Sequence, residues 1–228
     1  MLYLDLETRS ECDLIFHGLR RYAEDATTEV ICMAYCFDDG EVFFWWSNET
    51  FPQIVSDYFK AGGPIMAHNA EFERHLVEWV MSNDHDFAPP KLEQWRCSLV
   101  IGLANGFAGG LAALAAGLGL PFNKHTEGTR LIREYCSPGH LKEFREGDAD
   151  KMRAYNIADV EVMRAAVKCL RDPTDAEWKE YHLNCKINER GLPIDVAFCD
   201  AALAYTREVA DDANRQISEL TGGKMTKS

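Results

Sequence analysis

The first strand is predicted from strict alternation at the start of the chain. Residues 2–7 read Leu-Tyr-Leu-Asp-Leu-Glu, with a leucine at every even position. Because successive side chains of a strand point to opposite faces, the leucines share one face, and Tyr3, Asp5 and Glu7 share the other. Leucines in this pattern are typical of a buried, central strand. We therefore expect the two carboxylates to lie side by side on such a strand.

Most other predicted strands come early, and helices dominate later. Residues 30–37 and 41–46 are rich in β-branched and aromatic residues and are joined by Asp38-Asp39-Gly40, a hairpin signal. Short apolar runs predict strands at 65–67 and 92–97, and residues 83–90 are expected to form a loop. Helical spacing and helix breakers predict helices over residues 51–61, 70–81, 98–105, 111–117, 127–135, 148–170, 175–189 and 196–220. Asp148 is the expected N-cap of helix 148–170.

This order of elements predicts an α/β fold with a mixed sheet flanked by helices and a C-terminal helical extension. Arg171-Asp172-Pro173 breaks the helical pattern and marks the predicted domain boundary, giving a first domain of residues 1–172 and a second of 173–228. The second part is too short to form a large core alone. It must pack on the first domain or on a region that is absent from the chain.

A long uncharged stretch between Arg96 and Lys124 has the length of a membrane span. It is rich in glycine and alanine, however, and Gly109-Gly110 interrupts it. We therefore expect two short buried helices here, and no contact with a membrane.

Composition is that of a folded globular protein, with 46% hydrophobic and 27% charged residues. The net charge of −13 excludes a protein that holds nucleic acid by bulk positive charge, but not a nucleic-acid enzyme whose site is built from carboxylates. The eight cysteines include no C-x-x-C pair, so we expect reduced thiols and no disulfide partner. The sequence opens directly on the first predicted strand, with no basic leader, and the expected location is the cytoplasm of a bacterial or phage-infected cell.

Two carboxylates on one strand face repel each other unless a cation or a proton joins them. Asp5 and Glu7 are therefore candidate ligands of a hard cation such as Mg²⁺. An acidic pair at the end of a strand can also simply face water, so this motif needs support from elsewhere in the chain.

Asp159 provides that support. The apolar stripe of helix 148–170 is predicted to run through Met152, Tyr155, Met163 and Ala166, and Asp159 interrupts it near the middle. A carboxylate in that position needs a partner, which is either a metal ion or an arginine or backbone amide. Tyr155 lies one turn earlier on the same face, where it either packs in the core or places its hydroxyl beside the carboxylate.

A third polar cluster lies where strand 65–67 passes into the next helix. His68 is interpreted as structural, and Asn69 is a candidate N-cap. Glu73 falls in the first helical turn, where the helix dipole favours an acid even without a metal.

Together these elements are D-x-E on the first strand, N-x-x-F-E at a helix start, and Y-x-x-x-D on a late helix. In this order they resemble the three motifs of the DEDD exonuclease superfamily, tyrosine branch, and most closely the proofreading domain of family A DNA polymerases encoded by phages. The stretch of residues 124–132 (KHTEGTRLI) and that of 187–195 (INERGLPID) also look like that family. The resemblance spans nearly the whole chain.

The resemblance implies a ribonuclease H-like fold and 3′→5′ exonuclease activity on single-stranded DNA ends. It would make Asp5, Glu7 and Asp159 ligands of two Mg²⁺ or Mn²⁺ ions, with Asp5 bridging, while Tyr155 would orient the attacking water. By the same resemblance, the residues that contact the terminal nucleotide are Thr8 and Asn69. Phe72 is a further candidate for base stacking, although core packing is the preferred interpretation of this residue.

The chain departs from the family in one position. The second motif normally carries Asp where this chain has Glu73, so occupancy of the second metal position and the rate are open, although we expect activity. Residues beyond 173 contain none of the D-x-S-x-x-E, R-x-x-x-K or H-D-E motifs of a polymerase region, so we expect no DNA synthesis from this chain. Two alternatives remain: an exoribonuclease with the same site, and a catalytically silent binding module.

Overall fold

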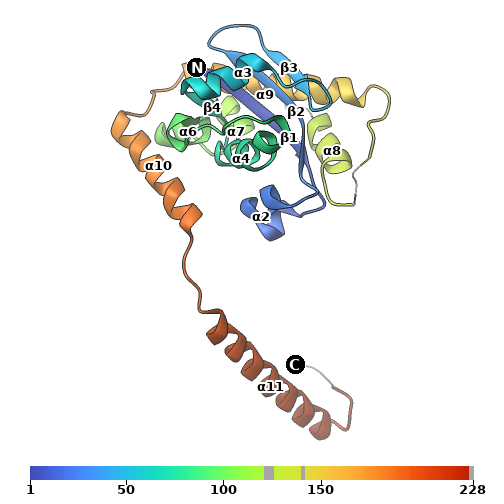
Figure 1. Cartoon of the computed structure of the whole chain (residues 1–228). Helices are drawn as coiled ribbons and strands as arrows, with labels where there is room; N and C mark the ends of the chain where they lie inside the picture. The colour runs from blue at the N-terminus through green and yellow to red at the C-terminus, as the bar shows by residue number, and fades with distance from the viewer. Residues whose placement is uncertain (121–125, 140–141, 226–228) are drawn as a thin grey trace. The chain divides into compact units, whose positions relative to one another are not determined.

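The computed structural model describes residues 1–120, 126–139 and 142–225. Its centre is a five-stranded sheet in the order β3-β2-β1-β4-β5 (Figure 1). The strands are β1 (Leu2–Arg9), β2 (Glu29–Phe37), β3 (Phe43–Trp46), β4 (Ile65–Ala67) and β5 (Trp95–Cys97). Strand β2 is antiparallel to both β1 and β3, whereas β4 runs parallel to both β1 and β5. The predicted α/β class is confirmed, and the mixed sheet is consistent with a ribonuclease H-like fold.

Helices cover both faces of the sheet and continue beyond it. The helices that precede the long uncharged stretch are α1 (Leu14–His17), α2 (Leu19–Glu24), α3 (Gln53–Ala61), α4 (Glu71–Leu76) and α5 (Ser82–His85). Those that follow are α6 (Ser98–Ala104), α7 (Leu111–Gly117), α8 (Thr126–Tyr135), α9 (Asp148–Lys168), α10 (Asp175–Arg190) and α11 (Val196–Leu220). A π-helical turn, η1 (Val77–Met81), joins α4 to α5, and a 3₁₀ turn, η2 (Leu92–Gln94), precedes β5. The short helices α1 and α2 had no counterpart in the sequence prediction.

Alternation along β1 divides the core between the two faces of the sheet. The leucines at positions 2, 4 and 6 are buried in a cluster with residues of α2, α3 and α4. Tyr3 lies on the opposite face, packed with Ile101 of α6 and with Val160 and Met163 of α9. On the same face as Tyr3, α8 packs against β2 and α9, and its residue Leu131 is fully buried. As a result, Asp5 and Glu7 point to the side of the sheet that α9 covers.

Two local predictions are wrong. The helix predicted to end at residue 81 passes through the π-helical turn and continues to His85, so it takes up part of the predicted loop at 83–90. Asp148 is also not an N-cap. Gly147 occupies that position in the left-handed conformation, and Asp148 is the first residue of α9, with its side chain held by Arg130 and Tyr135.

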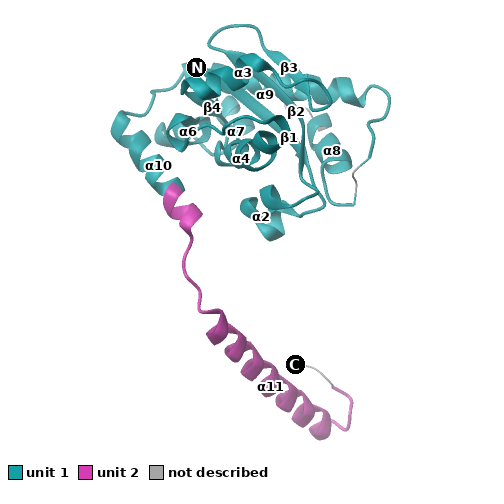
Figure 2. Ribbon diagram, viewed as in Figure 1, with its two compact units in different colours: residues 1–185 teal, residues 186–228 magenta. Residues whose placement is uncertain are grey.

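The chain forms two compact units, residues 1–185 and 186–228 (Figure 2). The first unit extends past the predicted boundary because Trp178, His182 and Cys185 of α10 are buried in it. The ring of His182 contacts the carbonyl of Trp95 at 2.9 Å. The second unit includes α11, which has no buried residue and begins at an N-cap, Asp195. Assignment of residues 173–228 to a polymerase region remains a prediction.

Both short helices predicted in the uncharged stretch are present, as α6 and α7. Among the described helices, none is long and apolar enough to cross a bilayer. All eight cysteines are free thiols.

Candidate metal centre

The central strand positions two of the predicted ligands. Asp5 pairs with Ala34 and Glu7 with Cys32 in the antiparallel register of β1 and β2. Because the strand alternates, the two carboxylates lie on one face, two residues apart, as the sequence pattern predicts. Glu7 is buried with 8% of its surface exposed, and Asp5 is half-buried.

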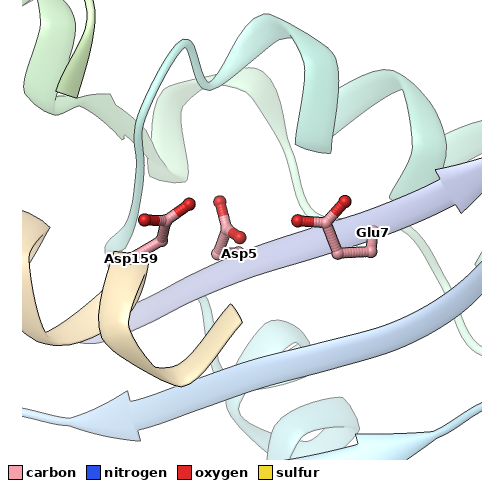
Figure 3. A group of neighbouring side chains, drawn as sticks. All are labelled: Asp5, Glu7 and Asp159. Atoms are coloured by element: carbon pink, nitrogen blue, oxygen red, sulfur yellow. The ribbon is translucent and has the colours of Figure 1, made fainter. Parts of the chain in front are cut away.

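The third carboxylate comes from α9. Asp159 brings an oxygen to the same point, so that one carboxylate oxygen from each of Asp5, Glu7 and Asp159 lies within 4.8 Å of the other two. Figure 3 shows the three side chains pointing to the same side of β1, with Glu7 leaning toward Asp5. Residues more than 150 positions apart in the sequence therefore meet in space, which is the geometric condition that the sequence argument required. Their role as metal ligands remains a prediction.

The buried face of α9 differs from the predicted one in the middle of the helix. Its buried stripe runs through Met152, Asn156, Val160, Met163 and Ala166, and not through Tyr155 and Asp159. The two stripes share Met152, Met163 and Ala166 and differ only in the middle of the helix. Asp159 consequently lies at the edge of the buried face, beside the carboxylates of β1, and does not point into the apolar core.

The buried face of α9 includes a residue that the sequence analysis missed. Asn156 is fully buried, and its side-chain Nδ2 donates to Oδ2 of Asp5 at 2.6 Å and to the main-chain oxygen of Asp5 at 3.2 Å. Both bonds require the amide nitrogen to face Asp5, which fixes the orientation of the amide. The sequence feature that could have identified Asn156 is its position as a polar residue between Tyr155 and Asp159, on a helix that is otherwise apolar at its centre.

The carboxylates are buried and repel one another, and a bound cation would relieve this repulsion. Burial raises the pKa of Asp5 well above its ordinary value, and the negative charge of Asp159 raises it further, while the bond from Asn156 opposes the shift. Burial likewise raises the pKa of Glu7, with further contributions from Asp5 and Asp159. Acidic groups this close cannot all ionise without a compensating positive charge. A donor set made only of carboxylate oxygens suits a hard divalent cation such as Mg²⁺ or Mn²⁺.

Glu73 lies near this group but outside it. It is 3% exposed in the first turn of α4, and the three-carboxylate cluster does not include it. Its pKa is raised first by burial and then by the charges of Asp5 and Glu7, and its Oε2 has no hydrogen-bond partner among the described residues. A buried carboxylate oxygen with no donor is costly, and a cation or a metal-bound water would satisfy it. The sequence analysis noted that the helix dipole favours an acid at this position even without a metal. That stabilisation alone does not account for the burial of the Glu73 carboxylate.

Tyr155 places its hydroxyl at the cluster, although it is not part of the core stripe. The pKa of this phenol is raised by burial and then by the charges of Glu7, Asp159 and Asp5, and its hydroxyl is hydrogen-bonded to the carboxylate of Asp159. The tyrosine is therefore protonated at neutral pH and acts as a hydrogen-bond donor or acceptor, not as a base.

The turn between β4 and α4 carries the other predicted polar residues. Asn69 is exposed, in the left-handed conformation at φ 62°, and its side chain does not cap α4, so its predicted N-cap role is wrong. His68 contacts the hydroxyl of Ser98 through Nδ1 at 2.9 Å, and burial lowers its pKa to about 4. A neutral histidine anchored between β4 and α6 agrees with the structural interpretation of this residue.

A groove of about 400 Å³ opens beside Glu7. Thr8 and Phe72, two of the predicted substrate-binding residues, line it together with apolar residues of α1 and the end of α8. The Thr8 hydroxyl is 2.7 Å from that of Tyr22, and the ring of Phe72 lies 6.1 Å from the Tyr22 ring. The volume falls in the range of small-molecule sites and accommodates a nucleotide.

Comparison with known proteins adds one finding. The chain is similar to part of a phage DNA polymerase. A DNA polymerase of Bacillus phage SP02 is 30% identical over 237 residues, an alignment that covers 97% of this chain and 36% of that polymerase. No family model matches the sequence.

The chain thus spans about a third of the length of the relative it matches. The alignment includes nearly all of both compact units, so the similarity is not confined to the sheet and the carboxylates. Within the stretch of residues 124–132 noted for its resemblance, Lys124 and His125 lie outside the described residues.

Proposed function

We propose that the chain is a 3′→5′ exonuclease of the proofreading type, which uses two divalent metal ions to remove nucleotides from single-stranded DNA ends. The observation that carries the proposal is the convergence of Asp5, Glu7 and Asp159 within 4.8 Å. Similarity to a phage DNA polymerase supports DNA as the substrate. As an enzyme it would be a divalent-metal-dependent phosphodiester hydrolase, acting in the cytoplasm of a bacterial or phage-infected cell.

In this proposal the ligands of Mg²⁺ or Mn²⁺ are Asp5, Glu7 and Asp159, with Glu73 serving a second ion. Two such ions would activate a water and stabilise the leaving 3′ oxygen. Asp5 is the candidate for a shared ligand, because its carboxylate lies with those of Glu7 and Asp159 and its charge raises the pKa of Glu73 as well.

The remaining roles belong to groups around the carboxylates. Tyr155 holds the attacking water through its hydroxyl, which is protonated and directed at Asp159. The terminal nucleotide occupies the groove beside Glu7, between Thr8 and the ring of Phe72. Asn69, on the exposed β4–α4 turn, is not among the residues that line this groove, and its proposed contact with the nucleotide rests on the resemblance alone. The apolar lining favours a nucleobase, while the negative charge of the protein is offset locally by the bound cations.

A polymerase region is the proposed partner of residues 173–228. The matched part is 36% of the SP02 polymerase, and α11 carries large apolar residues that are exposed in this chain, among them Phe198 and Leu203. DNA synthesis itself is not part of the proposal, because this chain contains no polymerase motifs.

The test is digestion of a 5′-labelled single strand with Mg²⁺ or Mn²⁺, with and without EDTA, alongside Asp5→Ala. We expect a metal-dependent ladder from the wild type and none from the variant. Absence of a ladder from the wild type at high protein concentration, with retained strand binding, would identify a silent binding module instead. Faster digestion of an RNA strand of the same sequence would identify an exoribonuclease.

A further inference from the structure

The ring of Tyr155 lies directly against the backbone of α8 at Gly128. A Cβ atom on that glycine would lie 2.5 Å from Cε2 and 2.6 Å from Cδ2 of the Tyr155 ring, closer than any real carbon contact. Gly128 is buried, and its backbone does not have a positive φ, so conformation does not require glycine there. Glycine inside a helix is normally unfavourable relative to alanine. The close approach of the tyrosine is the remaining structural reason for glycine at this position.

A methyl group at position 128 would have to displace either α8 or the tyrosine ring. The helix is firmly anchored. Its residues Leu131 and Tyr135 are buried with 0% and 1% exposure. The hydroxyl of Tyr135 donates to Asp148 of α9 at 2.7 Å, and Arg130 binds both oxygens of the same carboxylate, at 2.8 and 3.2 Å.

The tyrosine has fewer restraints. The side chain of Tyr155 is half-buried, and its hydroxyl interacts with the carboxylate of Asp159. Rotation about the side-chain bonds of Tyr155 would relieve the contact, but would also swing the hydroxyl away from Asp159. The absence of a side chain at Gly128 therefore decides where the Tyr155 hydroxyl lies.

We propose that Gly128 is a positioning residue for Tyr155: its bare backbone is the surface against which the ring lies, so that the hydroxyl reaches the carboxylate cluster. This inference rests on the proposed function only in what the hydroxyl then does, which is to hold the attacking water. Gly128 itself touches neither substrate nor metal.

Gly128→Ala tests the proposal. We expect kcat on a single-stranded DNA end to fall by about 10- to 100-fold, because a displacement of about 1 Å in a reacting geometry can have that effect. The KM for the strand and the affinity for Mn²⁺ should stay within about twofold, since neither depends on Tyr155. In a double-mutant cycle, Gly128→Ala combined with Tyr155→Phe should be no slower than Tyr155→Phe alone. Independent, multiplicative losses in that cycle, or a wild-type kcat for Gly128→Ala, would overturn the inference.

The matched control is Gly102→Ala on α6, where an added methyl would lie 3.2 Å from the flexible tip of Leu114. It should leave kcat unchanged. A second measurement is independent of activity: ¹⁹F NMR of protein labelled with 3-fluorotyrosine, with the Tyr155 signal assigned by its loss in Tyr155→Phe. In Gly128→Ala that signal should shift while those of the other tyrosines stay in place. An unmoved Tyr155 signal would refute the positioning role even if the wild type proves inactive on DNA.

Discussion

The amide of Asn156 holds the carboxylate of Asp5 at 2.6 Å, although 151 residues separate them in the sequence. The bond occupies one carboxylate oxygen of Asp5, and a second bond from the same amide reaches the main-chain oxygen of Asp5 at 3.2 Å. Among the described residues, Asn156 is the side chain that donates hydrogen bonds to Asp5. The geometry of the candidate metal centre thus depends on a residue that binds no metal itself.

Asn156→Ala is expected to weaken Mn²⁺ binding and to lower the rate by about 10- to 100-fold, the usual effect of removing a group that orients a metal ligand. Titration calorimetry with Mn²⁺ measures the affinity directly. Asn105→Ala is the matched control, since Asn105 also bonds main-chain atoms of a distant residue, Arg171, but lies outside the cluster. Equal affinities in wild type and Asn156→Ala would contradict the orienting role.

Asp5→Asn should stabilise the metal-free protein at pH 8. The pKa of Asp5 is raised in the folded state by burial and by Asp159, so the ionised form opposes folding once the pH exceeds its unfolded value of about 4. The stability that the protonated carboxyl contributes is fully present below that value and is lost as the pH rises through the raised folded pKa. We therefore expect a higher Tm for Asp5→Asn than for the wild type in EDTA. Addition of Mn²⁺ should raise the Tm of the wild type and not that of the variant; the reverse order in EDTA would count against a strained cluster.

Glu73→Gln should distinguish a ligand from a residue that only stabilises the helix start. Because the charges of Asp5 and Glu7 raise the Glu73 pKa, the amide should remove repulsion and raise the Tm without metal. If Glu73 serves the second ion, the number of Mn²⁺ bound per chain should fall by about one, and hydrolysis should slow by about 10-fold or more. Unchanged stoichiometry with an unchanged rate would leave Glu73 no role at the metal centre. Glu73→Asp, which introduces the residue of the second motif that the sequence resembles, should retain the stoichiometry.

The clamp between α8 and α9 should weaken in acid. Bonds from Arg130 and Tyr135 lower the pKa of Asp148 below its ordinary value. Its contribution to stability is therefore present above the unfolded value of about 4 and is lost as the pH falls through the lowered folded value. In thermal melts, Asp148→Asn should be less stable than the wild type at pH 7. The difference should shrink below about pH 4; a difference that is constant down to pH 2 would contradict the proposed cause.

Trp178→Ala should destabilise the first compact unit by about 3 to 5 kcal/mol, as expected for a large buried ring. The indole is 5% exposed, and the guanidinium of Arg96 lies 4.9 Å from its ring. Trp79, which is 40% exposed, provides the matched control, and Trp79→Ala should cost about 1 kcal/mol or less. Chemical denaturation measures both. Similar values for the two variants would show that α10 is not part of the folded unit.

Several features were predictable because they depend on short-range patterns. Alternation identified β1, the side-by-side placement of Asp5 and Glu7, and the burial of the leucines on the other face. Glycine and proline marked the ends of α3 and α10 within a few residues. The α/β class followed from the order of these elements, since each pattern reflects the local geometry of a strand or a helix.

Other features depended on contacts that no local pattern records. Packing against the sheet decided which residues in the middle of α9 are buried, and these are Asn156 and Val160 in place of Tyr155 and Asp159. The π-helical turn after α4 shifted the helical phase, and Asp148 joined Arg130 across two helices instead of capping its own. Similarly, the need for glycine at position 128 is visible only where the tyrosine ring meets it.

The sequence by itself determined the candidate ligands: a D-x-E pair on a strand and an acid on a late helix, because carboxylates among apolar residues need a partner wherever they lie. Only the tertiary structure decided that the three meet within 4.8 Å, that Asn156 holds one of them, and that Glu73 stands beside the group. The physical reason is that such distances are set by the packing of α4, α8 and α9 on the sheet, which is a property of the whole core and not of any one segment.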